Sequence, residues 1–294
     1  MTEFLEFVCE GQTHKIRLSD NADSETVRQL KDCLPTEITI HCAKIAGCHI
    51  YWPSPILARL EDAKDIHTLP PGAFLYYPDR QYLELIYGEL QAEKAAVTYL
   101  GQLEGNLDWL KEFATRQRQE AGTKIFIASL RLEIAQEASR PVSYSDDTAW
   151  GRIRNARRTV WKAEPAEVRD MLNNSGHNIP LGPMATADAY FRCVQESLWQ
   201  LWNTPERFPK YARKVAAINA LELGISRIGH YCHLTSSEAV LHDAIDCIQS
   251  DDVEFEDLLK ELILYCSRMS NWVDLHIPWY AANELALKTL GRTA

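Results

Sequence analysis

Residues 69–78 read LPPGAFLYYP, and residues 82–88 read YLELIYG. The Pro-Pro-Gly sequence is typical of a turn, and the aromatic residues after it favour a short strand. A second strand is expected over residues 82–87, where Gly88 ends it. Two short strands separated by turn residues are the repeating unit of an antiparallel sheet, so this stretch indicates a β-rich first half of the chain.

The same pattern of short strands and turns continues on both sides. A helix is expected after Asp23 or Ser24, and Pro35 ends it. A second helix is expected over residues 107–120, and residues 123–132 form either a closing strand or an amphipathic helix. Turn signals about every ten residues predict a closed or nearly closed β-barrel with one short helix plugging an end. Further strands are expected within residues 3–18 (two strands joined at Gly11), 37–41, 48–52 after an Ala46-Gly47 turn, and 97–100.

The spacing of apolar residues changes to a helical period in the second half of the chain. Residues 140–147 are rich in turn and helix-cap residues, which is typical of a linker. The predicted fold class is therefore α+β and multidomain, with a barrel domain over residues 1–140 and an all-α domain over residues 148–294. One long helix is expected from Pro205 to about His233.

Composition limits the possible partners and the compartment. The 294 residues carry a formal net charge of −10, which disfavours nucleic acid and anionic membrane as partners of the whole protein. A locally basic pocket for an anionic substrate remains compatible with this charge. The eight cysteines include no Cys-x-x-Cys pair, and the N-terminus lacks the features of a secretory signal. We therefore expect a cytoplasmic protein with reduced thiols.

Several familiar cofactor and catalytic motifs are missing from the sequence. It contains no Gly-x-Gly-x-x-Gly after a strand, no P-loop and no Gly-x-Ser-x-Gly. His230 and His233 have a spacing that two metal ligands on a helix can have, but a metal centre needs three or four converging ligands. We therefore expect neither a metal nor a redox cofactor.

A set of short motifs resembles the small bacterial cyclophilin-like domains. The resemblance covers about residues 3–110. It differs from the prolyl isomerases because Cys42 follows His41 where those enzymes carry an arginine, so isomerase activity is not expected. The motifs are Thr39-Ile40-His41, Ala46-Gly47, Tyr51-Trp52-Pro53, the stretch 69–78, Glu84-x-x-Tyr87-Gly88 and residues 101–106 (GQLEGN).

Such a domain followed by a long helical part is similar in architecture and length to the cucumopine and mikimopine synthases. These are opine-forming enzymes of Agrobacterium-type plasmids and of plant lines that acquired their genes. The resemblance implies condensation of L-histidine with 2-oxoglutarate by imine formation and a Pictet–Spengler-type ring closure, without a cofactor. It does not distinguish cucumopine from mikimopine, which differ in configuration.

This chemistry requires acid–base groups and groups that bind carboxylates. His41 and Lys44 lie on one strand and its following turn, and Glu84 stands in an otherwise apolar strand with Tyr87. If Glu84 points into the barrel, burial favours its protonated form and suits it to proton transfer. The candidate catalytic residues are His41, Lys44, Glu84 and Tyr87, and the candidate substrate-binding residues are Tyr77, Gln102 and Asn106.

The candidate residues can also have purely structural roles. Glu84 and Lys44 can be solvent-facing, His41 can be a satisfied strand histidine, and Asn106 can simply shape the turn after Gly105. Two other functions stay open: a cyclophilin-like hydrolase of small amides or acids, and a non-catalytic module whose barrel binds a metabolite or peptide. The amphipathic helices need burial, so we also expect a homodimer or packing of the helices on the barrel.

Overall fold

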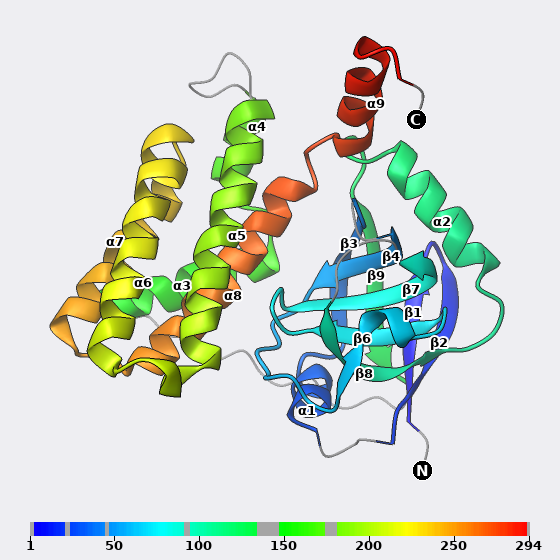
Figure 1. The fold of residues 1–294 in the computed structure, drawn as a ribbon, viewed down its shortest axis with the longest axis horizontal. Helices are drawn as coiled ribbons and strands as arrows, with labels where there is room; N and C mark the ends of the chain where they lie inside the picture. Colours follow the sequence, from blue (N-terminus) through cyan, green and yellow to red (C-terminus); the bar gives the residue numbers. More distant parts are fainter. Residues whose placement is uncertain are drawn as a thin grey trace. The chain divides into compact units, whose positions relative to one another are not determined.

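The computed structural model describes residues 3–20, 24–44, 47–90, 95–133, 147–173 and 181–292 (Figure 1). These residues form two compact units. The barrel unit combines residues 3–133 with residues 278–292, and the helical unit covers residues 147–277. The sequence-based division differs at its end, because it assigned residues 278–294 to the helical domain. Most of the predicted linker, residues 140–146, lies outside the described residues.

The barrel unit is a closed antiparallel barrel, so the predicted fold class is confirmed. Its strands follow the order β2-β1-β9-β3-β4-β7-β6-β8, and β2 pairs with β8 to close the ring. The short β5 pairs with β8 beyond the end of β2. The strands are β1 (Phe4–Cys9), β2 (Gln12–Leu18), β3 (Thr36–Cys42), β4 (Gly47–Pro53), β5 (Ala63–Asp65), β6 (Ala73–Tyr77), β7 (Tyr82–Leu90), β8 (Ala96–Leu103) and β9 (Phe126–Leu132).

The closing contact between β2 and β8 depends on a glycine. Gly101 lies opposite Leu18, and a Cβ atom on Gly101 would lie 2.3 Å from the backbone oxygen of Arg17. No side chain fits at that distance unless the two strands separate. A glycine in the interior of β8 is therefore explained by the close approach of another backbone.

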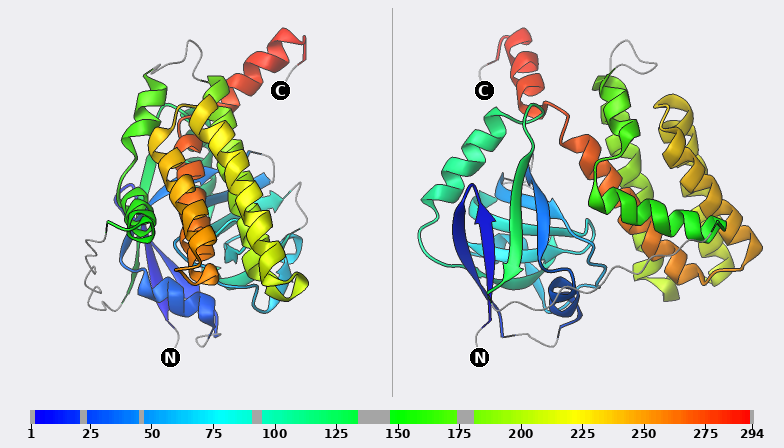
Figure 2. Two further views of the ribbon diagram at one scale, coloured as in Figure 1. Left: turned by 90° about the vertical axis from the view of Figure 1, so that its left-hand side faces the viewer. Right: turned by 180° about the vertical axis from the view of Figure 1, so that it is seen from behind.

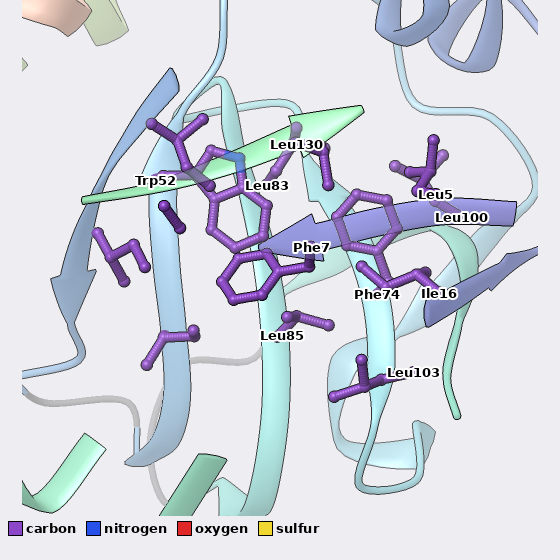
Figure 3. Close-up of a cluster of buried hydrophobic side chains, with 14 of the residues drawn as sticks. Leu5, Phe7, Ile16, Trp52, Phe74, Leu83, Leu85, Leu100, Leu103 and Leu130 are labelled. Carbon is purple, nitrogen blue, oxygen red and sulfur yellow. The ribbon is translucent and has the colours of Figure 1, made fainter. Parts of the chain in front are cut away.

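Alternation along the strands directs apolar side chains into the barrel. Trp52 stacks with Phe74 (centroids 6.0 Å apart) and lies 5.6 Å from the ring of Phe7. Leu83 and Leu85 join the same buried cluster (Figure 3). Because successive side chains of a strand point to opposite faces, the residues between these positions face out of the barrel.

Two helices add side chains to the barrel core. Helix α1 (Glu25–Asp32) begins after Ser24, whose hydroxyl accepts a hydrogen bond from the amide of Val27 at 3.1 Å, as predicted for a capping serine. Helix α2 (Asp108–Gln119) confirms the helix expected over residues 107–120.

The stretch 123–132, for which a strand and a helix were both expected, forms the strand β9, because its alternate residues Phe126, Ala128 and Leu130 enter the core. The 3₁₀ turn Ile66–Thr68 follows β5.

The helical unit is built around a buried helix. Helix α8 packs against α5 and α3, and its residues from Leu262 to Asp274 are buried. Ion pairs tie it to neighbouring helices, among them Arg213–Glu256 at 2.7 Å. The unit's helices are α3 (Ala149–Lys162), α4 (Ala166–Leu172), α5 (Leu181–Asn203), α6 (Lys210–Gly224), α7 (Thr235–Ser250) and α8 (Phe255–Asp274).

The long helix expected from Pro205 to about His233 is confirmed between Lys210 and Tyr231, where α6 continues without a break into a π-helical segment, but its expected first turn is a separate 3₁₀ turn. The structure has a 3₁₀ turn (Pro205–Arg207), then α6, then a π-helical segment (Ile225–Tyr231). Gly229 in that segment lies so close to Glu238 that a Cβ atom would lie 2.8 Å from its side chain. In the described ranges, no helix combines the length and apolar character needed to cross a membrane.

The last helix, α9 (Trp279–Thr289), belongs to the barrel unit and lies near α2 (Figures 1 and 2). Gly122, just after α2, packs directly on Pro278, and a Cβ atom on Gly122 would lie 2.6 Å from the Cα atom of Pro278. The hydroxyl of Tyr280 donates a hydrogen bond to the carbonyl oxygen of Ala43. These contacts explain why residues 278–292 group with the barrel.

Substitution of Gly101 tests the closing contact. We expect Gly101→Ala to lower the free energy of unfolding by about 1–3 kcal/mol, because the added methyl group meets backbone that cannot move independently. Urea unfolding followed by circular dichroism measures the loss. The exposed β2 substitution Thr13→Ala is the control and should change stability by less than about 0.5 kcal/mol. An equally small effect of Gly101→Ala would contradict the tight closure.

Candidate active site

Two candidate residues, His41 and Glu84, form one row with Tyr51 on the outer face of the barrel. His41 of β3 lies opposite Tyr51 of β4, and Tyr51 lies opposite Glu84 of β7. Directly opposed residues share a face, with Cβ atoms about 4.5–5.5 Å apart. Glu84 does not point into the barrel, where its neighbours Leu83 and Leu85 lie, yet its exposed fraction is only 3%. The barrel therefore presents a buried carboxyl group on its outer face.

Aromatic stacking organises this row. The rings of His41 and Tyr51 are stacked with centroids 5.0 Å apart, and Tyr51 also stacks on Tyr82 at 4.5 Å. The Nζ atom of Lys44 donates a hydrogen bond to the Tyr51 hydroxyl at 3.1 Å. His41 and Lys44, predicted as a pair, are thus brought together through Tyr51.

A second histidine lies beside Glu84. The Nε2 atom of His49 is 3.7 Å from Oε2 of Glu84, and both side chains are buried. Burial, and secondarily the positive charge of Arg118, lowers the pKa of His49 from 6.5 to about 4. His49 is therefore neutral at neutral pH, and the pair is not an ion pair there. A neutral imidazole next to a buried carboxyl group can exchange protons with a substrate.

Arg118 of α2 provides a cation close to these groups. Its Nη2 atom donates hydrogen bonds to the Tyr87 hydroxyl at 2.6 Å and to the carbonyl oxygen of Gly47 at 3.4 Å. The guanidinium carbon lies 6.0 Å from the ring centroids of both Tyr87 and Tyr280. Burial raises the pKa of Tyr87 to about 12, so its hydroxyl stays protonated.

Helix α9 places two aromatic rings next to the cations Lys44 and Arg118. Besides Tyr280, the ring of Trp279 has its centroid 5.7 Å from Nζ of Lys44. Burial raises the pKa of Tyr280 as well. Lys44 and Arg118 therefore each face an aromatic ring from this helix, an arrangement that stabilises cations through the ring quadrupole.

The other predicted residues have local partners. Tyr77 lies half-buried at the end of β6, against an apolar cluster on the outer face. Gln102 donates a hydrogen bond to the carbonyl oxygen of Pro71 at 2.8 Å and so braces the turn before β6. Asn106 accepts a hydrogen bond from the amide of Asp108 and leads the chain into α2. Substrate binding by these three residues stays a prediction.

Sequence reasoning missed His49, Tyr51, Arg118 and Tyr280. A signal existed for the first two, because His41 and Tyr51 belonged to quoted motifs and His49 lies two positions before Tyr51 on the same strand face. Arg118 and Tyr280 had no such signal. Their contacts join residues that are 31 and 237 positions apart in the chain.

The histidines of the helical unit do not form a metal centre in the part of the chain that the structure describes. His230 and His242 both approach Glu238, with nitrogen–oxygen distances of 3.1 and 3.8 Å. Among the described residues, no group of three or more His, Cys, Asp or Glu side chains is placed to hold a metal ion.

Comparison with known proteins identifies a similar fold. No protein-family model matches the chain, and no curated protein matches it in sequence. The solved structure of McbB in complex with tryptophan is similar to it with a TM-score of 0.76 and 17% sequence identity, over 96% of this chain and 99% of McbB. A solution structure of the hypothetical protein AF2241 from Archaeoglobus fulgidus covers 44% of this chain and 94% of its own, with 19% identity and a TM-score of 0.34. The McbB likeness therefore extends over both units and establishes a shared fold.

The low pKa of His49 predicts a pH-dependent stability. The unfolded chain binds a proton at this histidine near pH 6.5, but the folded chain binds it only near pH 4, so stability is lost as the pH falls through this window. We expect His49 to account for about 2 kcal/mol of the difference in unfolding free energy between pH 7 and pH 5. Urea titrations of the wild type and His49→Gln measure it.

The exposed His67 in the same unit provides the control for this effect. His67→Gln should keep the pH dependence of the wild type, whereas His49→Gln should flatten it. If the two variants show the same slope between pH 7 and pH 5, His49 is not held neutral by the fold.

Proposed function

We propose that the chain is an enzyme that condenses an amino acid bearing an aromatic ring with a keto acid and then closes a ring. The observation that carries the proposal is the pair of buried proton-transfer groups, His49 and Glu84, 3.7 Å apart on the outer face of the barrel. The fold it shares with McbB, which was solved with an aromatic amino acid bound, supports a substrate of this class.

The finer proposal names L-histidine and 2-oxoglutarate, as in the cucumopine and mikimopine synthases that the sequence resembles. The α-amine attacks the ketone carbon, and the resulting carbinolamine loses water to give an iminium ion. An imidazole carbon then forms a carbon–carbon bond to the iminium carbon, and that ring carbon loses its proton. The product equals both substrates minus one water, and no electrons are gained or lost overall.

The proton transfers suit the groups on the outer face. We assign to Glu84 the delivery of a proton to the departing water and the removal of the ring proton. Neutral His49, or His41 across Tyr51, accepts the proton of the amine. Lys44 binds a carboxylate, and Tyr87, which packs with the interior cluster and not on the outer face, donates a hydrogen bond, since its hydroxyl stays protonated. A homodimer stays a prediction that sedimentation velocity would test.

Glu84→Gln tests the acid–base role. The amide keeps the size of the side chain but cannot cycle a proton, so we expect turnover to fall at least about tenfold. The assay incubates purified protein with histidine and 2-oxoglutarate, without nicotinamide, and follows the product by mass spectrometry. Glu89→Gln is the matched control, because Glu89 lies on the same strand but is exposed.

Three outcomes would count against parts of the proposal. An unchanged rate in folded Glu84→Gln removes Glu84 from the chemistry. Wild-type protein that forms the adduct with tryptophan but not with histidine keeps the reaction class and overturns the amino acid assigned. Wild-type protein that binds both substrates in calorimetry without forming an adduct favours a binding module.

A further inference from the structure

We propose that Arg118 is the subsite that binds a carboxylate of the keto acid. The inference deepens the proposed function and rests on it for the identity of the ligand. Arg118 was not among the residues expected from the sequence, and it lies on α2 rather than on the strands that carry Glu84 and His49. Three observations support the assignment: the absence of an acidic partner of Arg118 among the described residues, its hydrogen-bond and ring partners, and its proximity to His49.

The first observation is that Arg118 lacks an acidic partner within the described residues. Two other arginines of the barrel unit have one: Arg116 lies 2.6 Å from Glu10, and Arg131 lies 2.6 Å from Glu6. Those two side chains are largely exposed, so they gain little from their ion pairs. Arg118 is half-buried, yet no carboxylate of the described chain lies within 4.0 Å of it. The rings and hydrogen bonds around this cation stabilise it without neutralising its charge, which leaves it able to bind an anionic ligand.

The second observation is that the guanidinium group is held in a fixed orientation. Hydrogen bonds to Tyr87 and Gly47 fix Nη2, and the rings of Tyr87 and Tyr280 lie at equal distances from the guanidinium carbon. The Nε atom is buried and donates no hydrogen bond to any described residue. An oriented guanidinium group with unused donor capacity matches a planar carboxylate, which accepts two parallel hydrogen bonds.

The third observation links Arg118 to the proton-transfer pair. Its positive charge contributes to the low pKa of His49, so the two groups lie close enough to interact electrostatically. A carboxylate bound at Arg118 would therefore lie within electrostatic range of His49, which is itself 3.7 Å from Glu84. Binding would also offset the charge of Arg118 and raise the pKa of His49, which makes this histidine a reporter of occupancy.

The test measures binding of glutarate, a dicarboxylate that has no ketone and cannot react. Isothermal titration calorimetry should show at least about tenfold weaker binding to Arg118→Gln than to the wild type, the loss expected for a charge-assisted contact of about 1.4 kcal/mol or more. Arg116→Gln is the matched control on the same helix and should bind glutarate as the wild type does. Equal binding by Arg118→Gln and the wild type overturns the assignment, as does tighter binding of inorganic phosphate than of glutarate.

A second measurement on unmutated protein guards against a variant that fails to fold. In NMR titrations, saturating glutarate should raise the pKa of His49, and no rise would overturn the subsite. Arg118→Lys keeps the charge but not the forked donors, so it should bind glutarate more weakly than the wild type. Because glutarate does not react, these results stand whether or not histidine and 2-oxoglutarate are the substrates. If the condensation assay fails while glutarate still binds, only the proposed reaction is contradicted and the Arg118 subsite is not.

Discussion

The pairing of β2 with β8 is the constraint on which the rest of the barrel unit depends. It turns an open sheet into a ring, and among the described strands only the short β5 lies outside this ring. In a ring of this size the interior is filled by side chains, here Trp52, Phe7, Phe74 and their neighbours. Ionisable side chains on the same strands must then face outward. The position of Glu84 and His41 outside the barrel follows from the packing of its inside.

The outer face combines two kinds of chemistry. Glu84, His49 and His41 are groups that can exchange protons, while Lys44 and, on the neighbouring helix α2, Arg118 are cations adjacent to aromatic rings. A condensation of an amino acid with a keto acid needs both kinds, because protons must move while carboxylates are held still. The chain as a whole carries a formal net charge of −10, so the overall charge does not by itself indicate an anionic ligand. The function that we propose uses both kinds of group.

Strand positions could be predicted from sequence, but the site could be predicted only in part. Gly11 and the Pro-Pro-Gly turn mark strand ends, and alternation separates Glu84 from Leu83 and Leu85. The direction of Glu84 required the barrel order, which depends on pairings between distant segments such as Leu18 with Gly101. The local pattern of apolar and polar residues in one strand does not show which distant strand it will pair with.

The same limit applies to residues on other elements. The helix containing Arg118 was expected, but its apolar spacing says only which side is buried and not that Tyr87 would receive its hydrogen bond. The change from α- to π-helix after α6 was also not predictable, because Gly224 and Gly229 are ordinary helix glycines until their close neighbours are known.

The return of α9 to the barrel makes the helical unit an insertion within the barrel unit. During synthesis on the ribosome, all nine strands are available once residue 132 has emerged, and the ring can close early. Tyr280, which donates its hydrogen bond to Ala43, lies 237 positions after Ala43 and is therefore translated much later than the strands. A nascent or proteolytically shortened chain that ends before residue 278 would therefore hold a folded barrel with Arg118 still open on one side. The surroundings of Arg118 would then be completed only when α9 has been made.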